Sequence, residues 1–363
     1  MVNIDLRLFK WGEKIMMSFR NEKIKKMSVP MNIVRTISKI NEYKGKQDLY
    51  YQQSPEIIKT LKEVAIIQST RASNSIEGIV INDKRLQDIM NQKVKPQSRS
   101  EEEIAGYRDV LSTIHSSSDS IPITSSVIRQ LHRDLYKFSP IDGGSWKNGD
   151  NIIQESLPSG ERRVRFRPVS AFQTPHAIDE LCSYFNDPTY KNEVEPLILI
   201  CTFIFDFLCI HPFDDGNGRM ARLLTLLLLY KSGYEVGRFI SIEKIIEESK
   251  ESYYETLEKS SQFWHEEEHD LFPWLEYMLG VIIAAFKEFE SRVGTIDDSR
   301  GNKGGRVIEA IEHFVSDFSK ADIRKACPDV GDSTINRALD KLKKEGVIKR
   351  ITAGRDAQWR KIK

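Results

Sequence analysis

The sequence predicts a mainly α-helical protein: a helical bundle with one β-hairpin, followed by a smaller C-terminal module of helices and a two-stranded ribbon. Apolar residues recur at helical spacing along most of the chain, and two segments near its middle are apolar on almost all sides. A polar, glycine-containing stretch precedes the C-terminal module. The chain has 363 residues, of which 40% are hydrophobic, enough for two or three domains with filled cores.

The bundle helices are predicted from the spacing of their apolar residues. Amphipathic helices are expected over residues 55–72, 101–116, 124–136 and 175–186. Pro55 and Pro175 lie near helix starts, where the missing N–H of proline costs little. Residues 196–210 and 222–230 are apolar almost all round, which is typical of central bundle helices. The loop between these two helices should therefore lie at one end of the core.

Two other parts of the chain have strand signals. Residues 151–153 and 163–166 flank a Pro-Ser-Gly turn signal, which predicts the hairpin. After a linker at 297–305, helices are expected near 307–314, 319–326 and 333–345, with Asp332 as a candidate N-cap. Strands at 347–352 and 358–362 then flank a turn at Gly354. Three helices followed by a ribbon predict a winged helix.

The charge distribution and the cysteines indicate which partners and which cellular compartment to expect. The net charge is +1, but residues 300–363 hold 16 Lys/Arg against 9 Asp/Glu, so DNA binding and protein binding are both open for this module. The four cysteines form no CxxC pair and indicate buried thiols in a reducing compartment. The sequence has no secretory signal pattern, and its most apolar stretch is too short to cross a bilayer. We therefore expect a cytoplasmic protein without membrane contact.

The most informative segment is the run from His211 to Arg222, HPFDDGNGRMAR. Its Gly-Asn-Gly turn opens a helix, so backbone N–H groups and the positive helix end should converge on an anion. Arg219 and Arg222 lie three residues apart and both can grip phosphate oxygens. Asp215 offers oxygen ligands for Mg²⁺, and His211 has a pKa suited to deprotonating a hydroxyl. The segment predicts a phosphotransfer site.

Every specified position of the Fic motif, HxFx(D/E)GNGRxxR, is filled in this segment, and the chain resembles the Fic/Doc superfamily over roughly residues 55–280. The resemblance implies a protein adenylyltransferase that moves AMP from ATP to a Ser, Thr or Tyr hydroxyl of a target protein or of the chain itself. It implies His211 as general base, Asp215 as the Mg²⁺ ligand, Gly216, Asn217 and Gly218 as the anion hole, Arg219 at the β-phosphate, Arg222 at the γ-phosphate, and Phe213 in the core.

Two further strings resemble Fic sequences. Tyr253 and Tyr254 match the helix beside the adenine, although Ser261 stands where some relatives have Asn. Residues 73–78, Ser-Asn-Ser-Ile-Glu-Gly, resemble the inhibitory motif (S/T)xxxE(G/N) of the class whose inhibitory helix is N-terminal. By that resemblance Ser73 and Glu77 belong to an inhibitory helix, and Glu77 pairs with Arg222 in place of the γ-phosphate.

The predicted hairpin resembles the flap that Fic domains use to pair with an extended target segment. The chain departs from the family nearby, with Lys147 where Arg is usual and Val169 where a second proline often follows Pro168. We expect an N-terminal helical region over 1–100, a Fic core over 101–295 and a winged helix over 296–363.

The alternative function is a transcriptional regulator that senses nucleotide in its Fic domain and binds DNA through its winged helix. The base of the nucleotide, the direction of the reaction, the target and the oligomeric state stay open, with a homodimer as one candidate.

Overall fold

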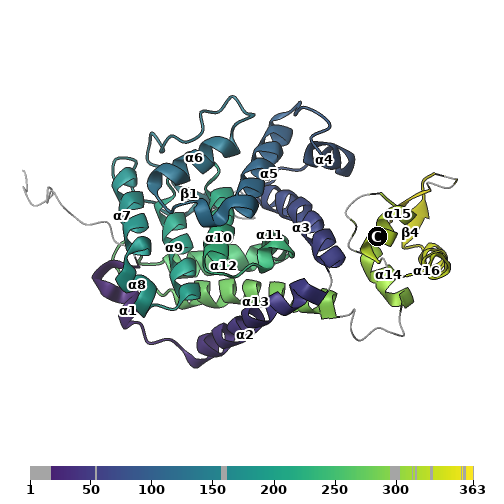
Figure 1. Ribbon diagram of the computed structural model, residues 1–363. Helices are drawn as coiled ribbons and strands as arrows, with labels where there is room; N and C mark the ends of the chain where they lie inside the picture. The colour runs from purple at the N-terminus through teal and green to yellow at the C-terminus, as the bar shows by residue number, and fades with distance from the viewer. Residues whose placement is uncertain are drawn as a thin grey trace, which may run out of the picture.

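The computed structural model describes residues 18–53, 55–156, 162–294 and 303–362, apart from residues 313, 315, 316, 328, 329, 353, 355 and 356. Figure 1 shows a large helical body, with the C-terminal module beside it. The mainly α-helical fold class is therefore confirmed. The turn predicted at 158–160 and most of the linker predicted at 297–305 lie outside the described residues.

The helices of the body run in several directions around a central pair (Figure 1). Its α-helices are α1 (Lys23–Lys26), α2 (Met31–Gln53), α3 (Pro55–Ile76), α4 (Asp83–Met90), α5 (Arg99–Ser117), α6 (Ser125–Leu135), α7 (Thr174–Asn186), α8 (Pro188–Glu193), α9 (Pro196–Ile210), α10 (Asn217–Lys231), α11 (Ile242–Glu248), α12 (Lys250–Ser261) and α13 (Phe272–Gly294). Short 3-10 helices, η2 (Arg20–Glu22), η3 (Ser118–Ser120) and η4 (Val236–Arg238), lie between them.

The central pair consists of α9 and α10, as the all-round apolar pattern predicts. Every residue from Leu197 to Ile210 is buried, and α9 packs against α7, α10 and α13. Burial of each large aliphatic side chain contributes about 2 kcal/mol. This packing holds the ends of α9 and α10, and hence the loop between them, in one place.

Helix starts and close contacts follow from local sequence. Ser98 and Thr124 accept hydrogen bonds from the first turns of α5 and α6. A side chain at Gly106 would collide with the carbonyl group of Leu135, so glycine allows α5 and α6 to approach closely. These two helices carry side chains that support the loop after α9.

The hairpin consists of β1 (Ile153–Ser156) and β2 (Arg162–Phe166), which pair antiparallel. The prediction for β2 was accurate to one residue, but the first strand was predicted at 151–153 and lies further along the chain. Asn151 is outside the strand because its side chain bonds to the loop after α9. A register shift between Ile153 and Gln154 marks the point where pairing begins.

The C-terminal module has its own apolar core, separate from that of the body. Its elements are α14 (Lys303–Glu312), β3 (Phe318–Ser319), α15 (Lys320–Ala326), α16 (Asp332–Lys344), β4 (Ile348–Arg350) and β5 (Gln358–Lys361). The three helices and the ribbon were predicted; β3, which pairs with β5, was not. The prediction of Asp332 as N-cap was wrong, because Gly331 holds that position and Asp332 pairs with Arg324. The winged-helix assignment stays a prediction.

All four cysteines are buried, as the sequence predicts, and none of them forms a disulfide within the described part of the chain. None of the helices in the described part of the chain has the length and apolar character needed to cross a lipid bilayer.

Candidate active site

The segment from His211 to Arg222 forms a turn between two buried helices. His211 ends α9 in the left-handed conformation, with φ 51° and ψ 63°. Gly216 has φ 81° immediately before α10, a conformation that glycine adopts without strain. The first N–H groups of α10 have no acceptor within the helix, so they face the turn as anion-binding donors.

Side chains hold this turn from inside. Asn217 both donates to the carbonyl oxygen of Phe213, at 2.8 Å, and accepts from its N–H, at 2.9 Å. Phe213 is fully buried, as predicted, and its ring stacks on His132 of α6 with centroids 3.7 Å apart. Asn217 thus shapes the turn through its side chain and offers only its backbone to a ligand.

His132 holds the other end of the turn. Its Nδ1 accepts from the N–H of Gly144 at 2.8 Å, so Nε2 carries the proton and donates to the carbonyl oxygen of Asp215 at 3.0 Å. Burial lowers the pKa of His132 to about 4, so the imidazole is neutral near pH 7 and keeps this tautomer.

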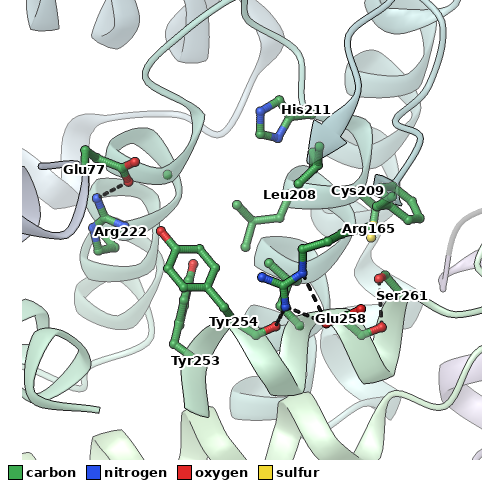
Figure 2. Close-up of a pocket in the computed structure, with 14 residues that line it drawn as sticks. Glu77, Arg165, Leu208, Cys209, His211, Arg222, Tyr253, Tyr254, Glu258 and Ser261 are labelled. Atoms are coloured by element: carbon green, nitrogen blue, oxygen red, sulfur yellow. Dashed lines mark hydrogen bonds and ion pairs between the residues drawn. The ribbon is translucent and has the colours of Figure 1, made fainter. Parts of the chain in front are cut away.

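A pocket of about 690 Å³ opens beside the turn. Its wall brings together three of the predicted site residues of the motif, namely His211, Gly218 and Arg222, and it also includes Glu77, Tyr253 and Tyr254 (Figure 2). The remaining lining residues are Ile153, Arg165, Phe166, Leu208, Cys209, Leu257, Glu258 and Ser261. The pocket joins the imidazole to a guanidinium.

Arg222 is buried and bound by the end of α3. Its Nε donates to Ser73 Oγ at 2.8 Å, and its Nη2 donates to the carbonyl oxygen of Ser73 and to Glu77 Oε1, each at 2.8 Å. Nη1 is buried without a partner in the described residues. Burial alone would lower the pKa of Arg222, but the Glu77 carboxylate reverses this and raises it, so the guanidinium stays charged.

The end of α3 is shaped to deliver Glu77. The helix ends at Ile76, and Gly78 follows with φ 79°, which is the left-handed conformation common just after helix ends. A side chain at Gly218 would collide with the Glu77 carboxylate, so glycine there permits the contact with Arg222. Lys250 of α12 donates to the carbonyl oxygen of Ile76 at 2.6 Å and caps α3.

His211 lies on the opposite side of the pocket from the Glu77 and Arg222 pair (Figure 2). Burial, and to a smaller degree the nearby ammonium of Lys147, lower its pKa to about 4. Its Nδ1 is buried and has no hydrogen-bond partner in the described residues. A neutral imidazole with an unpaired nitrogen is able to accept a proton.

Comparison with known proteins places this site in a family. Residues 122–229, which include the whole turn and both of its flanking helices, match the model of the Fic/DOC family. The chain contains a Fic domain. Over 236 residues it is 24% identical to the protein adenylyltransferase Fic of Nematostella vectensis, covering 62% of this chain and 50% of that protein. Over 160 residues it is 26% identical to protein adenylyltransferase fic-1 of Caenorhabditis elegans, covering 44% and 29%. This chain spans about half or less of the length of these curated relatives.

Solved structures share the fold of the Fic domain. A Fic family protein from Desulfovibrio desulfuricans superposes with a TM-score of 0.60 at 20% identity, covering 92% of this chain and 97% of the other. A Fic domain containing signaling protein from Bacteroides thetaiotaomicron gives a TM-score of 0.58 at 23% identity, covering 69% and 94%. At these identities the likeness shows the fold alone.

Four residues predicted to bind ATP or metal do not line the pocket of the Fic domain: Asp215, Gly216, Asn217 and Arg219. Arg219 is 1% exposed, and its guanidinium donates to Glu103 at 2.5 Å and to the Tyr136 hydroxyl at 2.8 Å. Asp215 is half-exposed and lies 3.3 Å from Arg99. Arg219 pairs with Glu103 of α5, a helix far from the motif in sequence, and no feature of the sequence indicated this pairing.

The donor set fits a magnesium ion held mainly by a nucleotide. Within the described ranges, no three His, Cys, Asp or Glu side chains are grouped as a metal site. One exposed carboxylate, Asp215, is what Mg²⁺ needs when phosphate oxygens and water supply its other ligands. Asp215 already accepts from the N–H of Gly216 at 2.7 Å, which orients the carboxylate at the turn.

Several residues of the Fic site were not predicted from the sequence. Arg165 of β2 and Glu258 of α12 line the pocket and bond to each other at 2.7 Å, which ties the flap to α12. Tyr253 and Tyr254, which were predicted from the sequence, line the pocket beside them; Tyr253 is buried and Tyr254 is half-buried against it. The run of arginines in β2 is visible in the sequence, but its partner on α12 is set only by tertiary packing.

Proposed function

We propose that this chain is a protein adenylyltransferase that transfers AMP from ATP to a Ser, Thr or Tyr hydroxyl of a protein, itself included, and that Glu77 inhibits it. One observation carries the proposal: a single pocket holds the neutral His211 imidazole and, across from it, an arginine with a buried, unpaired Nη1. Names of the curated relatives support the same activity.

The pocket and the turn beside it offer groups for phosphate binding and for proton transfer. Phosphate oxygens would accept hydrogen bonds from the first turn of α10 and from Arg222. His211 would take the proton from the target hydroxyl, whose oxygen would bond to the α-phosphorus while the bond to the β-phosphate oxygen breaks. The products are an AMP-modified side chain and pyrophosphate. Positioning and charge neutralisation would supply most of the rate enhancement.

Magnesium would bind at Asp215, where it would neutralise charge on the phosphates. In the structure Arg99 lies within 3.3 Å of this carboxylate, so the arginine would have to yield to the ion. Because Arg99 is 67% exposed, its side chain has room to turn away.

Glu77 would act by competition for Arg222. The carboxylate is bonded to Nη2, the group that the γ-phosphate would engage. While this ion pair holds, a triphosphate cannot place its terminal phosphate there, and the α-phosphorus is misplaced for attack. The pair lies partly in the low-dielectric interior, where its attraction is stronger than on the surface.

Incubation with labelled ATP and Mg²⁺ tests the proposal. We expect Glu77→Gly to transfer label to itself or to proteins of a lysate at least about tenfold faster than the parent, which corresponds to about 1.4 kcal/mol. Glu77→Gly/His211→Ala is the matched control and should transfer none. Label transfer by the double variant, or no transfer by Glu77→Gly, would reject the assigned chemistry.

A second candidate function is DNA binding by the C-terminal module. The exposed face of α16 carries Arg337, Lys341, Lys343 and Lys344, and β4 adds Lys349 and Arg350. Arg324 pairs with Asp332, Arg360 pairs with Asp317, and Lys341 lies 4.0 Å from Glu345. A gel shift of the full chain at low and moderate salt tests it: retention that Lys341→Ala/Lys343→Ala abolishes supports DNA binding, and no retention at low salt removes it.

A further inference from the structure

Lys147 is a charged residue with almost no solvent contact. It lies in the loop between α6 and β1 and is only 3% exposed. Its Nζ donates to the carbonyl oxygen of Ile210 and to Asn151 Oδ1, each at 3.0 Å, and its backbone N–H donates to the carbonyl oxygen of Pro212 at 2.9 Å. Lys147 therefore bonds to the residues on both sides of His211.

Asn151 extends this contact to the rest of the turn. Its side-chain oxygen accepts from Lys147, and its Nδ2 donates to the carbonyl oxygens of His211, at 3.5 Å, and Phe213, at 3.3 Å. Together Lys147 and Asn151 bond to four consecutive residues, 210 to 213: three through their side chains, and Pro212 through the backbone N–H of Lys147.

The backbone at His211 requires such support. A non-glycine residue in the left-handed conformation is strained, and the last carbonyl groups of a helix lack partners within it. An ammonium at the C-terminal end of α9 satisfies one of these carbonyls and interacts favourably with the negative end of the helix.

We propose that Lys147, together with Asn151, is a positioning residue for His211: it fixes the left-handed turn after α9 and so sets where the imidazole stands in the pocket. This inference rests on the proposed function, because the role of His211 as base is itself proposed. Lys147 does not line the pocket and acts through His211.

The ammonium also acts on His211 through its charge. Burial lowers the pKa of Lys147 to about 8, so it is still mostly protonated at pH 7, and its charge lowers the pKa of the imidazole. Asp150 and Asp214 lie near enough to favour the charged ammonium. The charged and titratable groups that face His211 from the other elements are Glu77 after α3, Arg165 of β2, Asp215 of the turn, Arg222 of α10, and Tyr253, Tyr254 and Glu258 of α12.

The experiment uses the full chain with Glu77→Gly, in which transfer is measured against pH and ATP affinity is measured separately. Adding Lys147→Met should lower the transfer rate about 10- to 100-fold, with ATP affinity changed less than about threefold, because the imidazole is misplaced and the phosphate site is intact. The acidic limb of the pH profile should move to higher pH, because the imidazole loses a neighbouring cation. Lys147→Arg keeps the charge and the donors and should restore most of the rate.

Asn151→Leu provides a second variant that leaves the ammonium in place. It should slow transfer while the acidic limb moves less than in Lys147→Met. Lys137→Met removes an exposed lysine of similar chain position and should match the parent. Equal rates for Lys147→Met and the parent, or an equal loss in Lys147→Arg, would overturn the proposal.

A titration that does not depend on transfer separates this inference from the proposed function. In histidine-labelled protein, the His211 resonance is assigned by its loss in His211→Ala and followed by NMR against pH. Lys147→Met should raise the pKa of His211 and shift the resonances of the 210–213 turn. An unchanged titration and unchanged resonances would overturn the inference even if the parent transfers no AMP.

Discussion

Arg222 Nη2 and Glu77 Oε1 lie 2.8 Å apart on one side of the pocket, although 145 residues separate them in sequence. Glu77 stands at the negative end of α3 and Arg222 near the positive end of α10, so each charge is unfavourable beside its own helix. The ion pair offsets both costs. A polyphosphate would relieve Arg222 in the same way, which makes the two states competitors.

Competition for Arg222 predicts that inhibition depends on the number of phosphates. Glu77→Gln keeps the side-chain shape but removes its charge, so we expect ATP to bind about tenfold more tightly while AMP affinity stays the same. Isothermal titration with ATP and AMP measures this. Arg222→Met/Glu77→Gln should lose the difference. If Glu77→Gln increased the affinity for AMP as much as the affinity for ATP, Glu77 would not act at the terminal phosphate.

Arg219 and Arg222 should differ in what they contribute. Arg219→Met leaves the buried Glu103 carboxylate without this partner, so we expect the free energy of unfolding to fall by about 3 kcal/mol with little change in ATP affinity. Arg222→Met should instead weaken ATP binding. Urea denaturation and titration with ATP make the comparison, and Arg219→Met/Glu103→Leu should recover part of the stability. Lost ATP binding without lost stability in Arg219→Met would favour the β-phosphate role predicted from the sequence.

Acid should destabilise the fold between about pH 6.5 and pH 4. Burial lowers the pKa of His115 and His269 to about 3 and of His132 and His211 to about 4. These histidines are neutral in the folded chain at pH 5 but take up protons on unfolding, because an unfolded histidine has a pKa near 6.5. The contribution of these histidines to the free energy of unfolding is therefore present above pH 6.5 and is lost as the pH falls toward their folded pKa values.

Buried acids oppose this trend, since burial raises the pKa of Glu195 and Glu243 as well as that of Asp206. Burial raises the pKa of Asp206 to about 7, so its contribution is present at low pH and is lost as pH rises through 7. At pH 5 four histidines gain a proton on unfolding and Asp206 loses one, so the net slope is up to about 4 kcal/mol per pH unit. Urea denaturation at pH 7, 6 and 5 checks this, and Asp206→Asn should steepen the slope. Equal stability at pH 7 and 5 would contradict it.

The flap should be held down by Glu258. This carboxylate accepts from Arg163 at 2.6 Å and from Arg165 at 2.7 Å, and these arginines belong to β2 while Glu258 belongs to α12. Glu258→Ala should therefore speed tryptic cleavage after these arginines about fivefold, since partly exposed ion pairs contribute up to about 1 kcal/mol each. Glu255→Ala, which removes an exposed glutamate of the same helix, should cleave at the parent rate. Equal rates for both variants would show that other contacts fix the flap.

Residues that are close in sequence account for what could be predicted. The turn from His211 to Arg222, the apolar helices on either side of it and the helix end at Gly78 all depend on local spacing and backbone preference. The strand predicted at 151–153 was misplaced for the opposite reason, because the partner of Asn151 is a turn 60 residues away. The long α2 was also missed, and the helix it packs against most, α13, lies far along the chain.

By itself, the sequence determined the helical class, the chemical groups at the turn and the order in which they occur, because these follow from residue type and short-range spacing. Only the tertiary structure decided which charges meet. It paired Glu77 with Arg222, buried Arg219 against Glu103 and set Lys147 behind His211. Such pairings depend on how helices distant in sequence pack, and burial then decides which of the charged groups face a ligand and which hold the fold together.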